Sequence, residues 1–130
     1  SNGGTALMDA AGQGHERVVD LLIQHGVELN LQNSDGVTAL MAAADNGHER
    51  VVDLLCQRGA EIDKQNSNGD TALMIAAGKG LERVVELLLQ RGADADLQNN
   101  GGATALMLAA INGHERVVEL LLQHGAEVNL

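Results

Sequence analysis

The sequence predicts an all-α protein in which four helix–turn–helix units stack into one solenoid. Three observations predict this fold class. The tetrapeptide Thr-Ala-Leu-Met recurs at residues 5, 38, 71 and 104, so successive copies begin 33 residues apart. Each repeat holds two short segments with helical spacing of apolar residues, separated by glycine. The chain also lacks Phe, Tyr, Trp and Pro, so its core must consist of aliphatic side chains and Met, which suit helices better than sheets. A fixed period of this length is typical of solenoids.

The unit boundaries follow from aligning the four tetrapeptides. The alignment gives units 1 to 4 at residues 1–31, 32–64, 65–97 and 98–130, and units 2 and 4 share 22 of 33 residues. We expect the four units to form one domain, residues 1–130. The last apolar segment, Val117 to Leu122, keeps the pattern of an internal unit, although terminal repeats normally have a polar outer face. We therefore expect a fragment of a longer array, whose apolar end frays or pairs with another copy.

Each unit begins with a short helix. In unit 2 the polar stretch "QNSDG" ends at Gly36, and Thr38 follows as a helix cap whose hydroxyl can accept a backbone N–H. The segment "ALMAAAD" is then predicted to be helical from Ala39. It is expected to stop at Asn46-Gly47, because glycine supplies the positive φ that ends a helix.

A second, amphipathic helix follows in each unit. The stretch "HERVVDLLCQRG" places Val51, Val52, Leu54 and Leu55 at helical spacing and ends at Gly59. The polar segment 60–69 is expected to join one unit to the next as an extended loop or a β-hairpin. Isolated helices shorter than about 12 to 15 residues are marginal in water, so each unit must pack on its neighbours.

The repeated unit, complete in "TALMLAAINGHERVVELLLQHGAEVN" at 104–129, resembles the ankyrin repeat, and the likeness covers essentially the whole chain. That family usually has Thr-Pro-Leu-His where this chain has Thr-Ala-Leu-Met. Without Pro, the first helical position loses a pre-set φ. In place of the polar histidine the chain has apolar, adaptable methionines, at Met8, Met41, Met74 and Met107. We expect a more apolar seam between units and somewhat looser loops.

The composition argues against several classes of partner. Eight basic and eighteen acidic residues give a net charge of −10, which repels phosphate backbones and anionic lipid surfaces. We expect neither a nucleic-acid nor a membrane partner. The sequence contains no apolar run near the roughly 18 residues of a membrane span and no signal-peptide pattern. Its single cysteine allows no internal disulfide. Together these features predict a cytoplasmic or other intracellular location.

We predict no metal, cofactor or catalytic site. The histidines at 15, 48 and 114 occupy equivalent places, but equivalent side chains in stacked units lie about 10 Å apart, whereas zinc needs nitrogens within about 2.1 Å of one ion. They are predicted to pack and bond locally in the turn before the second helix. Cys56 stands where other units have Ile23, Leu89 and Leu122, which indicates a small core side chain.

Variation between units marks the candidate binding surface. It clusters at the loop tip before each Thr and at the end of each first helix, and the ankyrin resemblance implies that these positions line a concave surface that grips protein partners. The loop-tip residues are Ser34, Asp35, Val37, Ser67, Asn68, Asp70, Asn100 and Ala103. The helix-end residues are Asp45, Asn46, Lys79, Ile111 and Asn112.

The resemblance implies a non-catalytic scaffold for protein–protein interaction. The acidic residues Asp35, Asp45 and Asp70 favour a basic partner, and the lack of aromatic residues means that the partner must supply the anchors. Two alternatives remain open. One is an engineered or consensus-derived array without a natural partner, since the units are nearly identical. The other is a module that associates with itself through uncapped ends.

Overall fold

The computed structural model describes residues 3–129, which form eight α-helices in chain order. The first helices of the four units are α1 (Gly3–Gln13), α3 (Ala39–Asp45), α5 (Ala72–Lys79) and α7 (Ala105–Ile111). The second helices are α2 (Glu16–Gln24), α4 (Glu49–Gln57), α6 (Glu82–Gln90) and α8 (Glu115–Gln123). The predicted all-α helix–turn–helix solenoid is thus confirmed.

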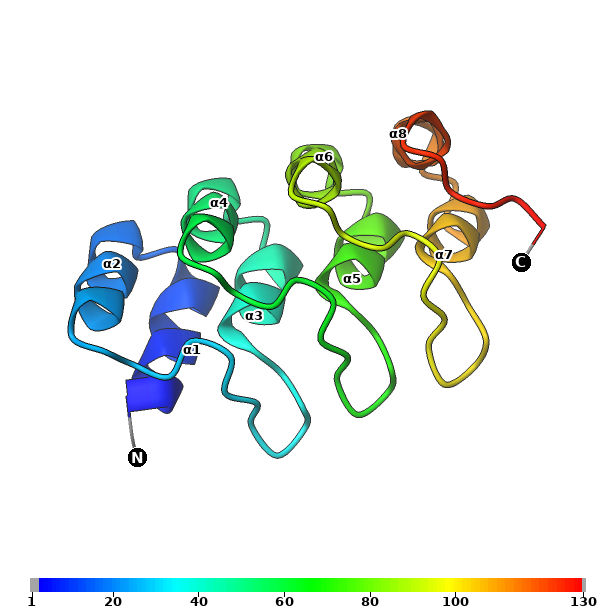
Figure 1. The fold of residues 1–130 in the computed structure, drawn as a ribbon. Helices are drawn as coiled ribbons and strands as arrows, with labels where there is room; N and C mark the ends of the chain where they lie inside the picture. Colours follow the sequence, from blue (N-terminus) through cyan, green and yellow to red (C-terminus); the bar gives the residue numbers. More distant parts are fainter. Residues whose placement is uncertain (1–2, 130) are drawn as a thin grey trace.

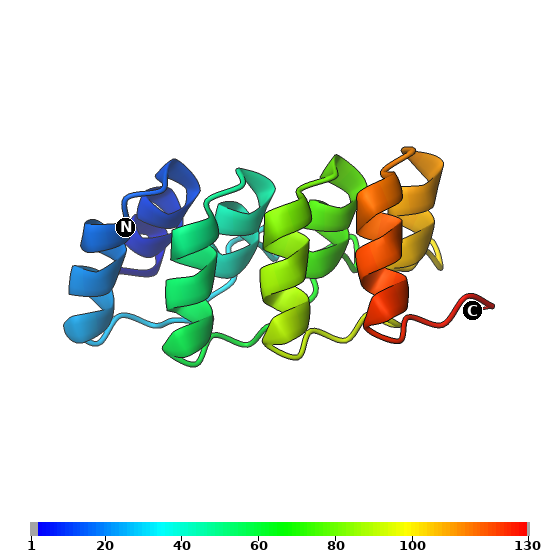
Figure 2. The ribbon, with the colours of Figure 1, turned by 90° about the horizontal axis from the view of Figure 1, so that it is seen from above.

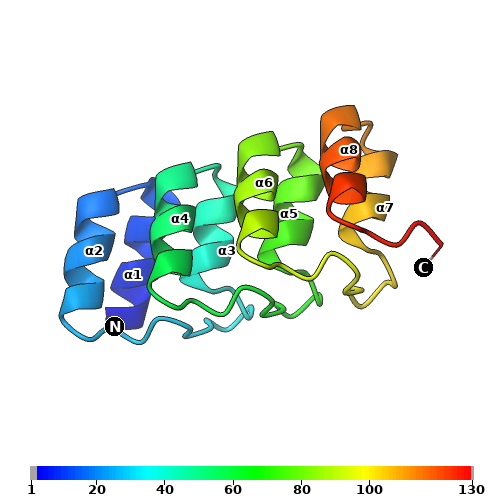
Figure 3. The same cartoon turned by 45° about the horizontal axis from the view of Figure 1, so that its top comes forward.

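The helices lie in two layers. The first helices form one row and the second helices form another, while the connecting loops project on the side away from the second helices (Figure 1). Seen from above and at an angle, the helix pairs follow one another in sequence order, with the N- and C-terminal ends at opposite ends of the stack (Figures 2 and 3). Extensive helix contacts occur only within a unit or between adjacent units. The fold is therefore held together by nearest-neighbour packing.

Threonine starts the first helices of units 2 to 4, as predicted. The hydroxyls of Thr38, Thr71 and Thr104 each accept a hydrogen bond from the backbone N–H three residues on, at 3.2 to 3.3 Å. All three threonines are buried, so the bond also satisfies a polar group inside the core. Helix α1 differs, because it begins at Gly3 and contains Thr5 within it.

Glycine ends the first helices where the sequence predicts it. After α3, Gly47 adopts a φ of 71° and donates to the Ala44 carbonyl, while the next N–H, of His48, reaches back to the Ala43 carbonyl. This pair of bonds is a Schellman motif, which satisfies carbonyls that the helix end leaves open. Gly59 closes α4 in the same way. Within residues 3–129 the connections between units are loops with turns, and none is a strand.

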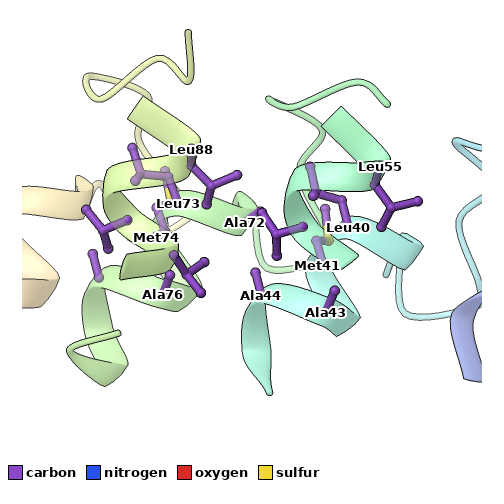
Figure 4. Close-up of a cluster of buried hydrophobic side chains, with 14 of the residues drawn as sticks. Leu40, Met41, Ala43, Ala44, Leu55, Ala72, Leu73, Met74, Ala76 and Leu88 are labelled. Atoms are coloured by element: carbon purple, nitrogen blue, oxygen red, sulfur yellow. The ribbon is translucent and has the colours of Figure 1, made fainter. Parts of the chain in front are cut away.

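The core is one apolar set repeated from unit to unit. Leu40, Met41 and Leu55 of unit 2 lie beside their equivalents Leu73, Met74 and Leu88 in unit 3 (Figure 4). All six are buried and belong to a single continuous cluster that runs through the stack. Because no unit closes this cluster by itself, each depends on the apolar face of the next.

Methionine shows this dependence directly. Met41 and Met74, which have a unit on both sides, are 1% and 2% exposed, whereas the equivalent Met107 in the last unit is 37% exposed. The methionines therefore fill the seam between units, as expected from the loss of histidine. Any change in their exposure reports whether a neighbouring unit is present.

We predict that Met74→Ala lowers the stability much more than Met107→Ala. Truncating a buried Met costs about 2–5 kcal/mol through lost transfer energy and the cavity left behind, and a partly exposed Met leaves less of a cavity. Urea unfolding followed by far-UV circular dichroism measures both losses. Equal losses would contradict nearest-neighbour burial as the source of stability.

Candidate functional site

Each loop tip is a turn held by hydrogen bonds to one asparagine side chain. In unit 2 the Oδ1 atom of Asn33 accepts from the backbone N–H groups of Asp35 and Val37, both at 2.9 Å. Asn66 and Asn99 make the same pair of bonds in the next two loops. A side chain that satisfies two backbone donors fixes the turn without a strand partner. The tips thus present their variable side chains from a defined backbone.

Neighbouring loops are hydrogen-bonded to one another. The side chain of Gln32 donates to its own loop at Gly36 and to the carbonyl of Gln65 in the next loop, at 2.9 Å. Gln65 repeats this bond to Gln98 at 3.0 Å. Backbone bonds also cross, from Ser67 to Asp35 and from Asn100 to Asn68, both 3.0 Å. The loops therefore form one continuous row.

The predicted loop-tip residues all lie in this row, and none is buried. Several of them also join the loops: the Ser67 hydroxyl donates to the Asp35 carbonyl at 2.6 Å, and Asn99 donates to the Asp70 carboxylate at 2.9 Å. The Asn100 side chain donates to the Ser67 carbonyl. Among the described residues, no cation pairs with the carboxylate of Asp35. Ser34, Asn68 and Ala103 add further accessible positions.

The helix-end residues form a second row, at the ends of the first helices. The Lys79 ammonium lies 2.6 Å from the Asp45 carboxylate and also donates to the Asp45 carbonyl. Asn112 donates to the Gly78 carbonyl of the preceding unit at 3.0 Å. Asn46 instead bonds within its own helix, to Ala42. Ile111 is 82% exposed.

The two rows are separate. Val37 precedes helix α3 and Asn46 follows it, so the seven residues of that helix, about 10 Å at 1.5 Å per residue, lie between them. The sequence-predicted residues therefore make two parallel strips rather than one cluster.

Sequence reasoning missed a third variable position, which lies on the first helices between the two strips. It holds Asp9, Ala42, Ile75 and Leu108 in the four units, and in units 2 to 4 it is a half-buried apolar residue. On a helix, residues three and four apart share a face, so Ala42 lies beside Asp45 and Asn46. The position differs in every unit, and that signal was available in the alignment.

The histidines before the second helices bond across the junction between units, which corrects the predicted local role. The Nε2 atom of His48 lies 2.9 Å from the Gly12 carbonyl in unit 1, and His114 Nε2 lies 3.0 Å from the Gly78 carbonyl in unit 3. A carbonyl only accepts, so both rings carry a proton on Nε2. Each ring lies over the turn of the preceding unit, where a Cβ added at Gly14 would meet the His48 ring at 2.6 Å.

An open cleft between the turns of units 1 and 2 has no histidine available for a ligand. Gly14, Gly47, His48 and Glu49 are among the residues that line it, between the turns of units 1 and 2. Its histidine is already bonded to the Gly12 carbonyl. Within residues 3–129, no three His, Cys, Asp or Glu side chains come together in a way that would hold a metal ion.

Cys56 is a half-buried thiol packed against the core. Burial raises its pKa from the ordinary 9.0 to about 11, and the negative charge of Asp53 adds to this, while the nearby Arg91 works in the opposite direction. A thiol is a nucleophile only as its thiolate, so this site disfavours reactivity near neutral pH.

The repeated helix pairs match a known family of proteins. A family model described as "Ankyrin repeats (3 copies)" matches the chain twice, over residues 1–66 and 58–130. The chain belongs to the ankyrin repeat family. Ankyrin repeats are generally protein-interaction modules and are generally non-catalytic. A comparison with curated proteins finds no match. In the described part of this ankyrin chain, no helix has both the length and the apolarity needed to cross a bilayer.

We predict that Cys56 reacts slowly with iodoacetamide at pH 8 and that the rate rises between about pH 9 and pH 11. Its thiolate fraction at pH 8 is small, so alkylation should be roughly ten- to hundredfold slower than in the urea-unfolded chain. Stability should fall over the same pH window, because the unfolded thiol ionises before the folded one does. Mass spectrometry of the alkylated chain provides the rate, and equal native and unfolded rates would refute this description of the site.

We predict that Gly36→Ala destabilises the array more than Gly59→Ala. Both glycines have positive φ, of 75° and 96°, so alanine carries a backbone penalty of about 1 kcal/mol at either position. A Cβ at Gly36 would also meet the Ser67 nitrogen of the next loop at 2.8 Å, whereas a Cβ at Gly59 meets nothing within 4 Å. Urea midpoints compare the two variants. If they fall equally, the loops are not packed against each other.

Proposed function

We propose that this ankyrin array is a non-catalytic scaffold that binds another protein through its loop-tip row and helix-end row. The observation that carries the proposal is that every residue of the two rows is at least partly exposed, on backbone that hydrogen bonds repeated from unit to unit hold in place. A surface ordered before binding loses little conformational freedom when a partner docks. This favours recognition of a folded, complementary face.

Apolar contact on this surface is limited to a few side chains. Ile111 is accessible, and Ile75 and Leu108 are half-buried between the rows. Interface hot spots are enriched in Trp, Tyr and Arg, and the two rows contain none of these. The partner therefore supplies the large aromatic or arginine side chains, and this chain supplies the apolar residues and polar groups that they contact.

The basic character proposed for the partner rests on the net charge of −10 and, locally, on Asp35. The other two acidic candidates have interactions of their own, since Asp45 pairs with Lys79 and Asp70 accepts from Asn99. An unpaired carboxylate at a loop tip is free to meet a cationic group. Charge of this kind mainly speeds encounter and selects partners.

Three further points belong to the proposal. The scaffold works inside the cell. An engineered array without a natural partner is the alternative, which the 22 of 33 residues shared by units 2 and 4 favour. Flanking repeats of divergent sequence in the parent gene would decide for the natural scaffold. Self-association through the ends is compatible with either origin.

We predict that Asp35→Lys weakens capture of the partner by roughly two- to fivefold, because an exposed charge contributes about 0.5–1 kcal/mol. The immobilised chain is incubated with cell extract, captured proteins are identified by mass spectrometry, and the dissociation constant of each is then measured with purified protein. Asp70→Asn removes a second charge while keeping an oxygen for Asn99. Glu28→Lys, an equal charge reversal outside the two rows, is the control.

The outcome depends on which variant changes the affinity. A protein that loses affinity with Asp35→Lys, keeps it with Glu28→Lys and binds more weakly as salt rises supports the proposed surface. If a protein binds all the variants with equal affinity, the loop tips are not part of its binding interface.

A further inference from the structure

The two ends of the stack carry apolar surface that the internal units cover. The N-terminal face is the side of unit 1 that includes His15, Arg17, Val18 and Leu21. The C-terminal face is the side of unit 4 that includes Met107, Gly113, Glu115 and Leu122. These faces lie at opposite ends of the stack (Figure 2).

On the N-terminal face, a valine that internal units bury is exposed. Val18 is 46% exposed, whereas the equivalent residues Val51 and Val84, which have a preceding unit, are each 1% exposed. Leu21 is also exposed, while its equivalents are half-buried at Leu54 and buried at Leu87 and Leu120. The preceding unit therefore buries this valine and covers the leucine at least in part.

The C-terminal face likewise exposes apolar residues that are buried or half-buried in internal units. Met107 is exposed where Met41 and Met74 are buried, and Leu122 is 44% exposed where the equivalent Leu89 is 7% exposed. Inside the stack, the following unit covers these positions at least in part, and the equivalents Met8, Ile23 and Cys56 are half-buried. The internal junctions thus show what fits each end face: the opposite face of another unit.

We propose that the chain associates head to tail, with the C-terminal face of one copy packed on the N-terminal face of the next in the register of an internal junction. The first unit of a second copy carries the same Val-Val and Leu-Leu pattern that units 2 to 4 present to their predecessors. The joint continues an interface that the fold already contains three times.

Polar groups at the two faces match in the same register. At internal junctions His48 and His114 lie over a glycine turn and donate to a carbonyl of the preceding unit. Gly113 is the equivalent turn at the C-terminal face, and a Cβ there would meet nothing within 4 Å. His15 of a second copy has room over this turn. It then donates to the carbonyl of Ile111.

Charged groups also pair in this register. Arg83 of unit 3 lies 3.7 Å from Glu49 of unit 2. The equivalents across the joint are Arg17, whose side chain is 74% exposed, and Glu115 of the other copy. The joint therefore combines apolar contact with opposite charges, in the same arrangement as an internal junction.

Because the two faces differ, the contact is heterologous. Each copy keeps one free face after pairing, so association continues beyond a dimer and yields open chains rather than a closed symmetric pair. This inference concerns a different surface from the proposed partner-binding rows. Its salt dependence is also opposite, because copies of net charge −10 repel each other and added salt screens that repulsion.

Analytical ultracentrifugation of the chain tests the joint between about 10 μM and about 1 mM, a range that covers weak association. We expect the average mass of the wild type to rise past that of a dimer, and to rise further with salt. Val18→Glu blocks the N-terminal face, and Met107→Glu blocks the C-terminal face. Each variant alone should remain monomeric, and their equimolar mixture should form a dimer and nothing larger.

Leu31→Glu is the matched control, because Leu31 is also partly exposed, and unit 2 has the charged Lys64 at the same position. This variant should associate like the wild type. A wild type that stays monomeric at about 1 mM overturns the proposal. So does a dimer formed by either blocked variant alone, since that would mean pairing of like faces.

Hydrogen exchange of the wild-type chain tests the joint without any substitution. Protection of amides in α1 and α2 and in α7 and α8 should rise together with concentration, while α3 to α6 stay constant. A rise at one end only would overturn head-to-tail pairing.

Discussion

Burial of one apolar strip between adjacent units is the constraint on which the rest of the structure depends. The helices have between seven and eleven residues, too few for stability in water by themselves. A side chain such as Met74 becomes buried only when a unit lies on each side of it, as the exposed Met107 shows. Stability is therefore a property of junctions, and the strict recurrence of Thr-Ala-Leu-Met follows because every junction needs the same shapes in the same places.

The junctions between units are of two kinds, which differ in the residue at the end of the first helix. This residue belongs both to the junction and to the candidate binding surface. Where the first helix ends in Gly12 or Gly78, the next unit brings a histidine that bonds to that glycine's carbonyl. Where it ends in Asp45, the next unit brings Leu81, and the aspartate pairs with Lys79. Variation at the helix ends is thus partly explained by junction chemistry. The side chains of Asp35 and Ile111 take part in no hydrogen bond or ion pair between the described units, so they are available to contact a partner.

Local rules made the helices predictable, and geometry between units limited the rest. The bounds of α3 and its threonine cap follow from residues close in sequence, since a cap and a glycine stop act over three or four positions. Contacts between side chains of different units were harder to predict. The shortest arginine ion pairs between units run from Arg58 and Arg91, at the ends of second helices, back to Asp20 and Asp53 of the preceding unit, at 2.8 and 2.7 Å. The Arg58 contact is an ion pair without hydrogen-bond geometry. Which side chains meet depends on the offset between stacked units, and no single unit encodes that offset.

The separation of the two candidate rows has the same origin and limits how the surface can work. Loop tips and helix ends lie at opposite ends of the first helices, so a small partner that touches Asp35 does not also reach Asp45 of the same unit unless it spans the helix between them. A partner laid along the stack meets equivalent positions of successive units instead, where the spacing is fixed by loop-to-loop bonds such as Gln32 to Gln65. The variable position on the first helices, with Ile75 and Leu108, lies on the path between the rows. Recognition by this array therefore favours a partner broad enough to cover two or more units, because only such a partner gathers enough accessible side chains to offset the lack of aromatic anchors.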